Sequence, residues 1–295
     1  MAVTAEYTPL AIYGNDDAGF RIWAEAWHDA VTALGCTQVY SNIDFTTATI
    51  SATSGVLTGG RVYQLDDDLH ATSPVFFKLE WGRGNGYGVN NGFKMQVTVG
   101  EAHSSGTLSG NVFTHYVTAP RLITEIGEII SVRSDAGILL ATNNVHSLCG
   151  QDGFMLERTR VDGVPVADGL GFLLFGSDVN DTSGTTSDSV AQAVDYIMGT
   201  VYMSNGGFGL GFDAPCFVSP TVSPAANGKT PVFPIALFGG YDPLRMVIGV
   251  SSTALGYNTR FAATVNGETG NYRTVTKPPY SIFGTGNIMA FLEGE

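Results

Sequence analysis

The strongest indication of the fold is the stretch Glu157-Arg158-Thr159-Arg160-Val161-Asp162-Gly163-Val164-Pro165-Val166. Its central dipeptide, Asp162-Gly163, adopts positive φ angles at low cost, as the two-residue turn of a β-hairpin requires. A second dipeptide of this kind, Asn266-Gly267, stands between the run Phe261–Val265 and the run Glu268–Val275. The sequence therefore predicts antiparallel hairpins at two distant places in the chain.

Short strand-like runs follow one another along most of the chain. Each run is bounded by Gly, Pro, Asn or Asp and is rich in β-branched or aromatic residues. The runs are Gly60–Leu65, Pro74–Trp81, Phe93–Val99, Leu122–Val132, Gly137–Thr142, Phe154–Val161, Gly169–Phe175, Tyr196–Met203, Arg245–Val250, Phe261–Val265 and Asn271–Thr276. Strands at this spacing predict a mainly β protein, with an antiparallel β-sandwich or a jelly-roll-like fold.

One segment near the N-terminus has a helical pattern instead. Apolar residues recur there at steps of three and four, which places them on one face of a helix: Phe20, Trp23, Trp27, Val31 and Leu34. One of Asn15, Asp16 and Asp17 is expected to cap the helix, and Gly35 to end it. We expect one amphipathic α-helix over residues 17–35. Core packing of its tryptophans is favoured over contact with another subunit.

The chain reads as a single β-rich domain over residues 1–295. No change of composition marks a boundary, and the weakest point for a subdivision lies near Ala119. The segment 215–234 contains five of the twelve prolines and is expected to run as an extended crossing segment. Together with the loop 178–189, it is long enough to carry function or to contact a neighbour.

The composition excludes one class of partner. Of 295 residues only 14% are charged, and 14 Lys and Arg against 27 Asp and Glu give a net charge of −13. Nucleic-acid binding is not expected, because contacts from Lys and Arg to phosphate supply most of that affinity. The surface is expected to be covered by Ser, Thr, Asn and backbone.

The cellular setting is predicted from what the sequence lacks. The first residues have no basic and apolar signal-peptide pattern, and no run approaches the ~20 apolar residues of a membrane span. We therefore expect synthesis in the cytoplasm and no membrane insertion. Cys36, Cys149 and Cys216 fit neither a disulfide framework nor metal spacing, and are interpreted as buried thiols.

Catalytic motifs are missing, so neither an enzyme nor a cofactor is predicted. The sequence contains no Walker A motif, no HExxH and no GxSxG, and the glycine-rich tract after Trp81 opens no helix. The weakest alternative is a wall-degrading glycosidase, whose two carboxylates can come from distant strands. Glu80, Glu157 and Asp195 are its candidate acids. In a strand, the pair Glu157-Arg158 is more often used for cross-strand charge matching.

Two ligand sites are open hypotheses. Asp66, Asp68 and His70 would share one face of a strand and could hold a divalent metal, although a polar turn is the more ordinary interpretation. Exposed aromatic rings could also stack on sugars while amides bond the hydroxyl groups. The residues of that second site would be Trp81, Tyr87, Asn85, Asn90 and Asn91, and its alternative is that Trp81 closes the core at a strand end.

Several runs resemble structural proteins of tailed bacteriophages. Pro74-Val75-Phe76-Phe77-Lys78-Leu79-Glu80-Trp81-Gly82 is similar to a strand of that family that ends in Tyr or Trp plus Gly. Met95–Gly100 followed by Gly106-Thr107-Leu108-Ser109-Gly110 resembles its V-x-V-G strand and Gly-Thr-Leu-x-Gly turn. Gly153–Gly163 resembles its E-R-x-x-D-x-G passage. The resemblance covers residues 60 to 165, and departs from the family at the glycine-rich residues 82–92.

The resemblance implies a virion structural protein from a tail, baseplate or collar. Such a protein would act by assembly with copies of itself and with other virion proteins, in a closed symmetric oligomer. It would be assembled in the host cytoplasm and found in the virion. The alternative of a different class is a carbohydrate- or receptor-binding virion protein that uses the aromatic and Asn residues above on a surface glycan.

Overall fold

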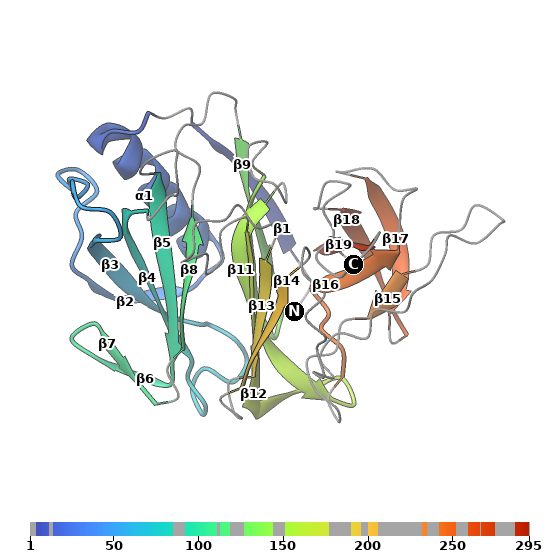
Figure 1. Cartoon of the computed structure of the whole chain (residues 1–295). Helices are drawn as coiled ribbons and strands as arrows, with labels where there is room; N and C mark the ends of the chain where they lie inside the picture. The colour runs from blue at the N-terminus through green and yellow to red at the C-terminus, as the bar shows by residue number, and fades with distance from the viewer. Residues whose placement is uncertain are drawn as a thin grey trace.

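The computed structural model describes residues 4–11, 14–84, 92–110, 113–118, 127–143, 151–176, 190–195, 200–205, 232–234, 242–251, 259–265, 267–274 and 287–294. Within these residues the chain forms nineteen strands and one helix (Figure 1). All strand pairs are antiparallel. The prediction of a mainly β, antiparallel fold with one N-terminal helix is confirmed.

The helix α1 (Asp17–Ala33) begins and ends where its sequence indicates. The Asp16 carboxylate accepts a hydrogen bond of 2.7 Å from the Gly19 N–H, and Gly35 has a φ of +84° just after the C-cap residue Leu34. Trp23 and Trp27 are buried against Phe93 and Phe154. The prediction that the tryptophans pack in the core is confirmed.

A seven-stranded sheet, called the central sheet below, has the order β1-β9-β10-β11-β12-β13-β14. From β9 to β14 the strands are neighbours in chain order, and β1 adds to the β9 edge. The bounds are β1 (Thr4–Leu10), β9 (Gly127–Arg133), β10 (Gly137–Asn143), β11 (Gln151–Val161), β12 (Val164–Gly176), β13 (Val190–Asp195) and β14 (Thr200–Asn205).

Two five-stranded sheets complete the described architecture. The helix-side sheet has the order β2-β3-β4-β5-β8, with β2 (Thr37–Ser41), β3 (Leu57–Gln64), β4 (Phe76–Arg83), β5 (Phe93–Gly100) and β8 (Phe113–Thr118). A small hairpin of β6 (Ala102–Ser104) and β7 (Thr107–Ser109) follows β5. The C-terminal sheet has the order β15-β16-β19-β18-β17, with β15 (Val232–Pro234), β16 (Val247–Ser251), β17 (Arg260–Val265), β18 (Glu268–Thr274) and β19 (Asn287–Gly294).

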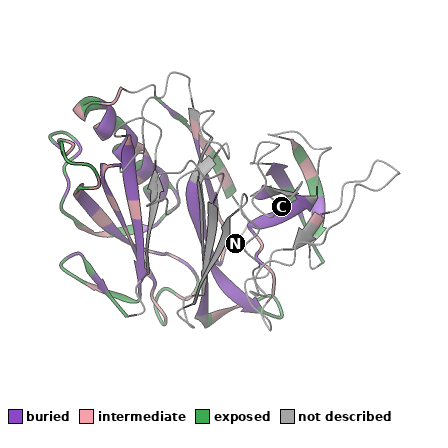
Figure 2. Cartoon of the chain, in the orientation of Figure 1, coloured by how far each residue is buried: buried purple, intermediate pink, exposed green. Residues whose placement is uncertain are grey.

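The central sheet lies between the other two sheets (Figure 1), and its strands β9, β10 and β11 are buried on both faces (Figure 2). Alternate residues of its strands enter two separate cores, as the pleat requires. Leu140 and Phe154 join a core with α1 and the helix-side sheet. Leu139 and Met155 join a core with the C-terminal sheet. The sandwich therefore has three layers, and β11 contacts both outer ones.

The hairpin predicted at Asp162-Gly163 is present. The two residues have φ angles of +51° and +78° and join β11 to β12, with Val161 opposite Val164. Gly267 has a φ of +81° between β17 and β18, whereas Asn266 lies outside the described residues. Both hairpins thus form where the dipeptides indicate.

Several predictions about chain organisation concern residues that the structure does not describe. Ala119 and residues 178–189 and 215–231 lie outside the described residues, and 232–234 form β15. Cys36 is buried as predicted, while Cys149 and Cys216 are not described. In the described part of the chain, no helix has the length and apolar character needed to span a membrane.

Candidate functional site

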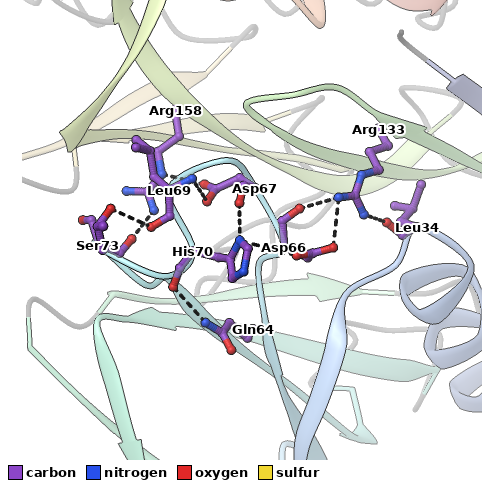
Figure 3. Close-up of polar contacts among 10 residues, drawn as sticks. Leu34, Gln64, Asp66, Asp67, Leu69, His70, Ser73, Arg133 and Arg158 are labelled. Atoms are coloured by element: carbon purple, nitrogen blue, oxygen red, sulfur yellow. Dashed lines mark hydrogen bonds and ion pairs between the residues drawn. The ribbon is translucent and has the colours of Figure 1, made fainter. Parts of the chain in front are cut away.

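The acidic run Asp66-Asp67-Asp68 lies in a turn, residues 65–73, between β3 and β4. The strand of β3 ends at Gln64, so Asp66, Asp68 and His70 do not share a strand face as the metal hypothesis required. The turn lies against the central sheet, and two arginines of that sheet reach its acidic side chains (Figure 3).

Arg158 of β11 holds this turn in the interior. Its Nε donates a hydrogen bond of 2.6 Å to Oδ2 of Asp67, and the two side chains are only 2% and 1% exposed. The terminal guanidinium nitrogens donate to the carbonyl oxygens of Ala167 and Ser73. The other oxygen of Asp67 accepts from the N–H of Leu69 at 3.0 Å. This buried ion pair therefore joins the helix-side sheet to the central sheet.

Arg133 of β9 makes a second contact beside the first. It donates to the carbonyl oxygens of Leu34 and Asp66, and its guanidinium lies 3.2 Å from Oδ2 of Asp66. The His70 Nδ1 donates to the carbonyl oxygen of Asp67 at 2.5 Å and lies 3.5 Å from Oδ1 of Asp66. Asp68 is exposed.

The predicted metal residues are thus not assembled as a ligand set. Asp66 and His70 are close, but an arginine holds the carboxylate, and Asp68 is an exposed residue of the turn. No group of three or more His, Cys, Asp and Glu suited to a metal ion occurs among the described residues. The polar-turn interpretation fits this geometry.

Glu157, which precedes Arg158 on β11, bonds the layer of the C-terminal sheet instead of the helix-side layer. Its Oε1 accepts a hydrogen bond of 2.8 Å from the N–H of Arg245, and its Oε2 accepts one of 3.1 Å from the N–H of Met246. These two N–H groups lie just before β16. Adjacent residues on one central strand therefore bond both outer layers.

The same geometry argues against Glu157 as a catalytic acid. Burial raises the pKa of its carboxyl, against the opposing effects of Arg160 and of the two N–H donors. Such a shift is common in active sites, but a general acid must reach its substrate. Glu157 is 1% exposed and both oxygens are already bonded. Glu80 pairs with Lys78 at 2.6 Å, and the side chain of Asp195 is not described.

The sugar-platform hypothesis fails at its one described residue. Trp81 is fully buried, with its ring 5.4 Å from that of Phe45, so no sugar can stack on it. The hypothesis of an exposed Trp81 is wrong, and the alternative interpretation, that Trp81 closes the core, is confirmed. Residues 80 and 81 alternate across β4, and Trp81 takes the core face. Asn85, Tyr87, Asn90 and Asn91 lie outside the described residues.

A pocket of about 340 Å³ lies between the β11–β12 hairpin and the C-terminal sheet. Its charged lining residues are Arg160, Asp162, Asp242, Arg245 and Glu268, and its apolar lining includes Leu244, Tyr272 and Leu292. The volume is at the small end of the ~300–1,000 Å³ of ligand pockets. Sequence reasoning missed this site, because its residues come from segments about 100 positions apart.

No family model matches the chain, and neither the curated proteins nor the solved structures searched contain a match.

Ion pairs fix both arginines of the pocket. Asp135 lies 2.7 Å from the Arg160 guanidinium and 3.5 Å from that of Arg245, whose Nε lies 2.8 Å from Glu268. The pairing register of β11 with β12 shifts between Arg158 and Arg160. This shift places Arg160 on the same face of β11 as Glu157, the face toward the C-terminal sheet. Strict alternation would have placed these two residues on opposite faces.

The hairpin tip, defined as residues 161–164, is anchored beside this pocket. The N–H of Gly163 donates to Oδ2 of Asp242 at 2.6 Å, and the N–H of Asp242 donates to the carbonyl oxygen of Arg160 at 2.8 Å. Val161 and Val164 are nevertheless 41% and 63% exposed. The tip is thus a fixed apolar projection next to an acidic pocket.

His28 of α1 lies between two residues of β3. Its Nδ1 is 2.9 Å from the Tyr63 hydroxyl, and its Nε2 is 2.6 Å from a guanidinium nitrogen of Arg61. Because a guanidinium only donates, Nε2 accepts and the proton of the neutral ring is on Nδ1. Burial, and then the charge of Arg61, lower the pKa of His28.

Acid is therefore expected to destabilise the protein through His28. Since the folded pKa is below the ordinary ~6.5, the unfolded chain binds the proton first as the pH falls, and stability decreases below about pH 6.5. Urea unfolding at about pH 7.5 and about pH 5.5 measures this loss. The His28→Gln variant should lose less stability over that interval. An equal loss in the two proteins would contradict the assignment.

Proposed function

We propose that this protein is a structural component of a bacteriophage virion, in a tail, baseplate or collar, and that it acts by association with other virion proteins. Under this proposal it is assembled in the host cytoplasm and is found in the particle. The rigid three-layer domain presents fixed surfaces, and its interior charges serve the fold.

One observation carries the proposal: Glu157 and Arg158 use buried charge to bond the two outer sheets to the central sheet. A buried charged group is costly unless it has a partner. Any other packing of the three sheets would leave these charged groups without their partners, so the pairs favour the observed arrangement of layers. A part in a symmetric assembly needs this fixed geometry, since every copy must present the same surface.

Two further observations support it. The runs that resemble phage structural proteins fall on ordered elements: β4, β5, the β6–β7 hairpin and β11 with its turn. The hairpin tip also exposes Val161 and Val164 on an anchored turn. Exposed apolar side chains on a fixed projection are typical of protein contacts, although two residues make a small patch.

Mass spectrometry of purified particles from the phage that encodes the chain tests the proposal. We expect its peptides in particles that survive a density gradient, at a stoichiometry that is a small whole multiple of a ring symmetry. Peptides found only in the soluble lysate would reject a structural role. Light scattering on the isolated protein complements this test by giving its own oligomeric state.

A further inference from the structure

The acidic pocket and the hairpin tip form a continuous surface. Asp162 and Gly163 belong to both, and Val161 and Val164 flank them. Hydrogen bonds to Asp242 and the Asp135 ion pair hold this surface in shape before any partner binds. Pre-organisation lowers the entropy cost of binding.

The charge of this surface is negative. Arg160 and Arg245 are outnumbered by the three carboxylates that line the pocket, Asp162, Asp242 and Glu268, together with Asp135, which pairs with both arginines. Asp162 has no bonding partner in the described part of the chain, and Glu268 has a half-exposed side chain. A positively charged group fits this balance.

The pocket wall also contains an unused hydrogen-bond donor. Arg160 has a side chain that is 6% exposed, and its Nε–H has no acceptor among the described residues. Buried donors in native proteins are almost always satisfied. A carbonyl oxygen of a bound polypeptide would satisfy this donor once a shift of the Arg160 side chain uncovers its Nε, which is buried in this structure.

The chain's own cations are a poor source for the positive group. Of its 14 Lys and Arg, Arg121, Lys229 and Lys277 are not described, which leaves eleven. Each of these eleven bonds to a group within the chain, even the exposed Arg260, which pairs with Glu293. The described part of a second copy would therefore offer the pocket no cation that lacks a partner in its own chain, and the chain as a whole carries a net charge of −13.

We propose that the pocket and hairpin tip are the docking site for a basic segment of a different virion protein. A Lys or Arg of that segment enters the pocket and pairs with Asp162 and Glu268, while an apolar neighbour covers Val161 and Val164. This inference rests on the proposed function and specifies the chemistry of one partner.

The pocket is tested first with a small probe, Nα-acetyl-arginine amide, and with its uncharged analogue, Nα-acetyl-citrulline amide, by protein-observed NMR. We expect the arginine probe to cause saturable chemical-shift changes at residues of the pocket. The affinity for the citrulline probe should be at least about tenfold lower, because the site recognises the positive charge. In the double variant Asp162→Asn with Glu268→Gln, most of the difference in affinity between the two probes should disappear. Equal binding of both probes, or none, would overturn the pocket assignment.

The partner is tested with a photo-reactive amino acid at position 164 and, as the matched control, at position 56, because Val56 is 43% exposed and its carbonyl oxygen bonds the N–H of Arg83 in the helix-side sheet, not in the sheets that line the pocket. We expect particles carrying the probe at 164 to give a cross-link to a Lys- or Arg-containing segment of a different protein. A cross-link to a second copy, to an acidic segment or to nothing would reject the docking site.

These outcomes separate the two proposals. If the protein is present in particles but position 164 gives no such cross-link, the docking site is wrong and the structural role stands. If the protein is absent from particles, the proposed function fails, whatever the arginine probe shows. The thermal unfolding midpoint of each variant, expected to match the wild type at these exposed positions, excludes misfolding as the cause.

Discussion

Replacing Arg158 by Met is expected to lower the free energy of unfolding by about 3–5 kcal/mol. The substitution leaves the carboxylate of Asp67 buried without its cation. It also removes the donor to the carbonyl oxygen of Ser73, whereas the carbonyl oxygen of Ala167 keeps the hydroxyl of Ser73 as a donor. Breaking one partner of a buried pair is costly for this reason, whereas the intact pair itself adds little. Chemical denaturation followed by tryptophan fluorescence measures the change, because Trp23, Trp27 and Trp81 are all in the core.

The matched control is Arg260→Met, which removes an arginine from the pair with Glu293, where the arginine is 64% exposed. An exposed pair is worth no more than about 1 kcal/mol. In a double-mutant cycle, Asp67→Leu with Arg158→Met should cost less than the sum of the single changes, by about 1–3 kcal/mol. Additive effects, or an Arg158→Met protein as stable as Arg260→Met, would refute the interlayer pair.

Replacing Glu157 by Ala is expected to cost about 2–6 kcal/mol, from two orphaned N–H groups at about 1–3 kcal/mol each. The N–H groups of Arg245 and Met246 lose their acceptors, and Arg160 loses a nearby negative charge. We expect the C-terminal sheet to loosen from the central sheet first. Hydrogen exchange should show this as faster exchange at residues 245–250 than in the helix-side sheet.

Glu80→Ala is the control for this second prediction, because it makes the same chemical change on a strand of an outer sheet. In the described chain Glu80 bonds the side chains of Lys78 and Gln96, so its removal orphans no backbone N–H and the loss should stay near about 1 kcal/mol. If both variants lose the same stability, or if exchange rises equally in all three sheets, Glu157 does not have the role assigned to it.

Local signals in the sequence predict most of the elements. The spacing of Phe20, Trp23 and Trp27 predicts α1 because a helix with one buried face needs that period. Asp162-Gly163 predicts its hairpin because few dipeptides adopt two positive φ angles. Strands without these signals were missed, such as β1, which contains Pro9 at a sheet edge, and β13, whose run Val190–Asp195 alternates weakly.

The sequence does contain an indication of the third layer, but a search for alternating apolar and polar residues overlooks it. Ile138-Leu139-Leu140-Ala141 and Phe154-Met155-Leu156 are continuous apolar runs, which is what a strand buried on both faces requires. The sites were harder to predict. Neither the partners of Asp67 and Glu157 nor the pocket follow from spacing, because they join residues about 90 positions apart. The bulge that turns Arg160 toward Arg245 is likewise set by tertiary contacts.

Cryo-electron microscopy of the intact particle tests most directly whether this chain works by fitting against other proteins. The account predicts density for the three stacked sheets in a symmetric ring of the tail, baseplate or collar, with residues 161–164 against a neighbour that is a different protein. Particles whose density is fully explained by other proteins would contradict it, and a copy of this chain whose hairpin tip faces open solvent on every side would contradict the docking site alone.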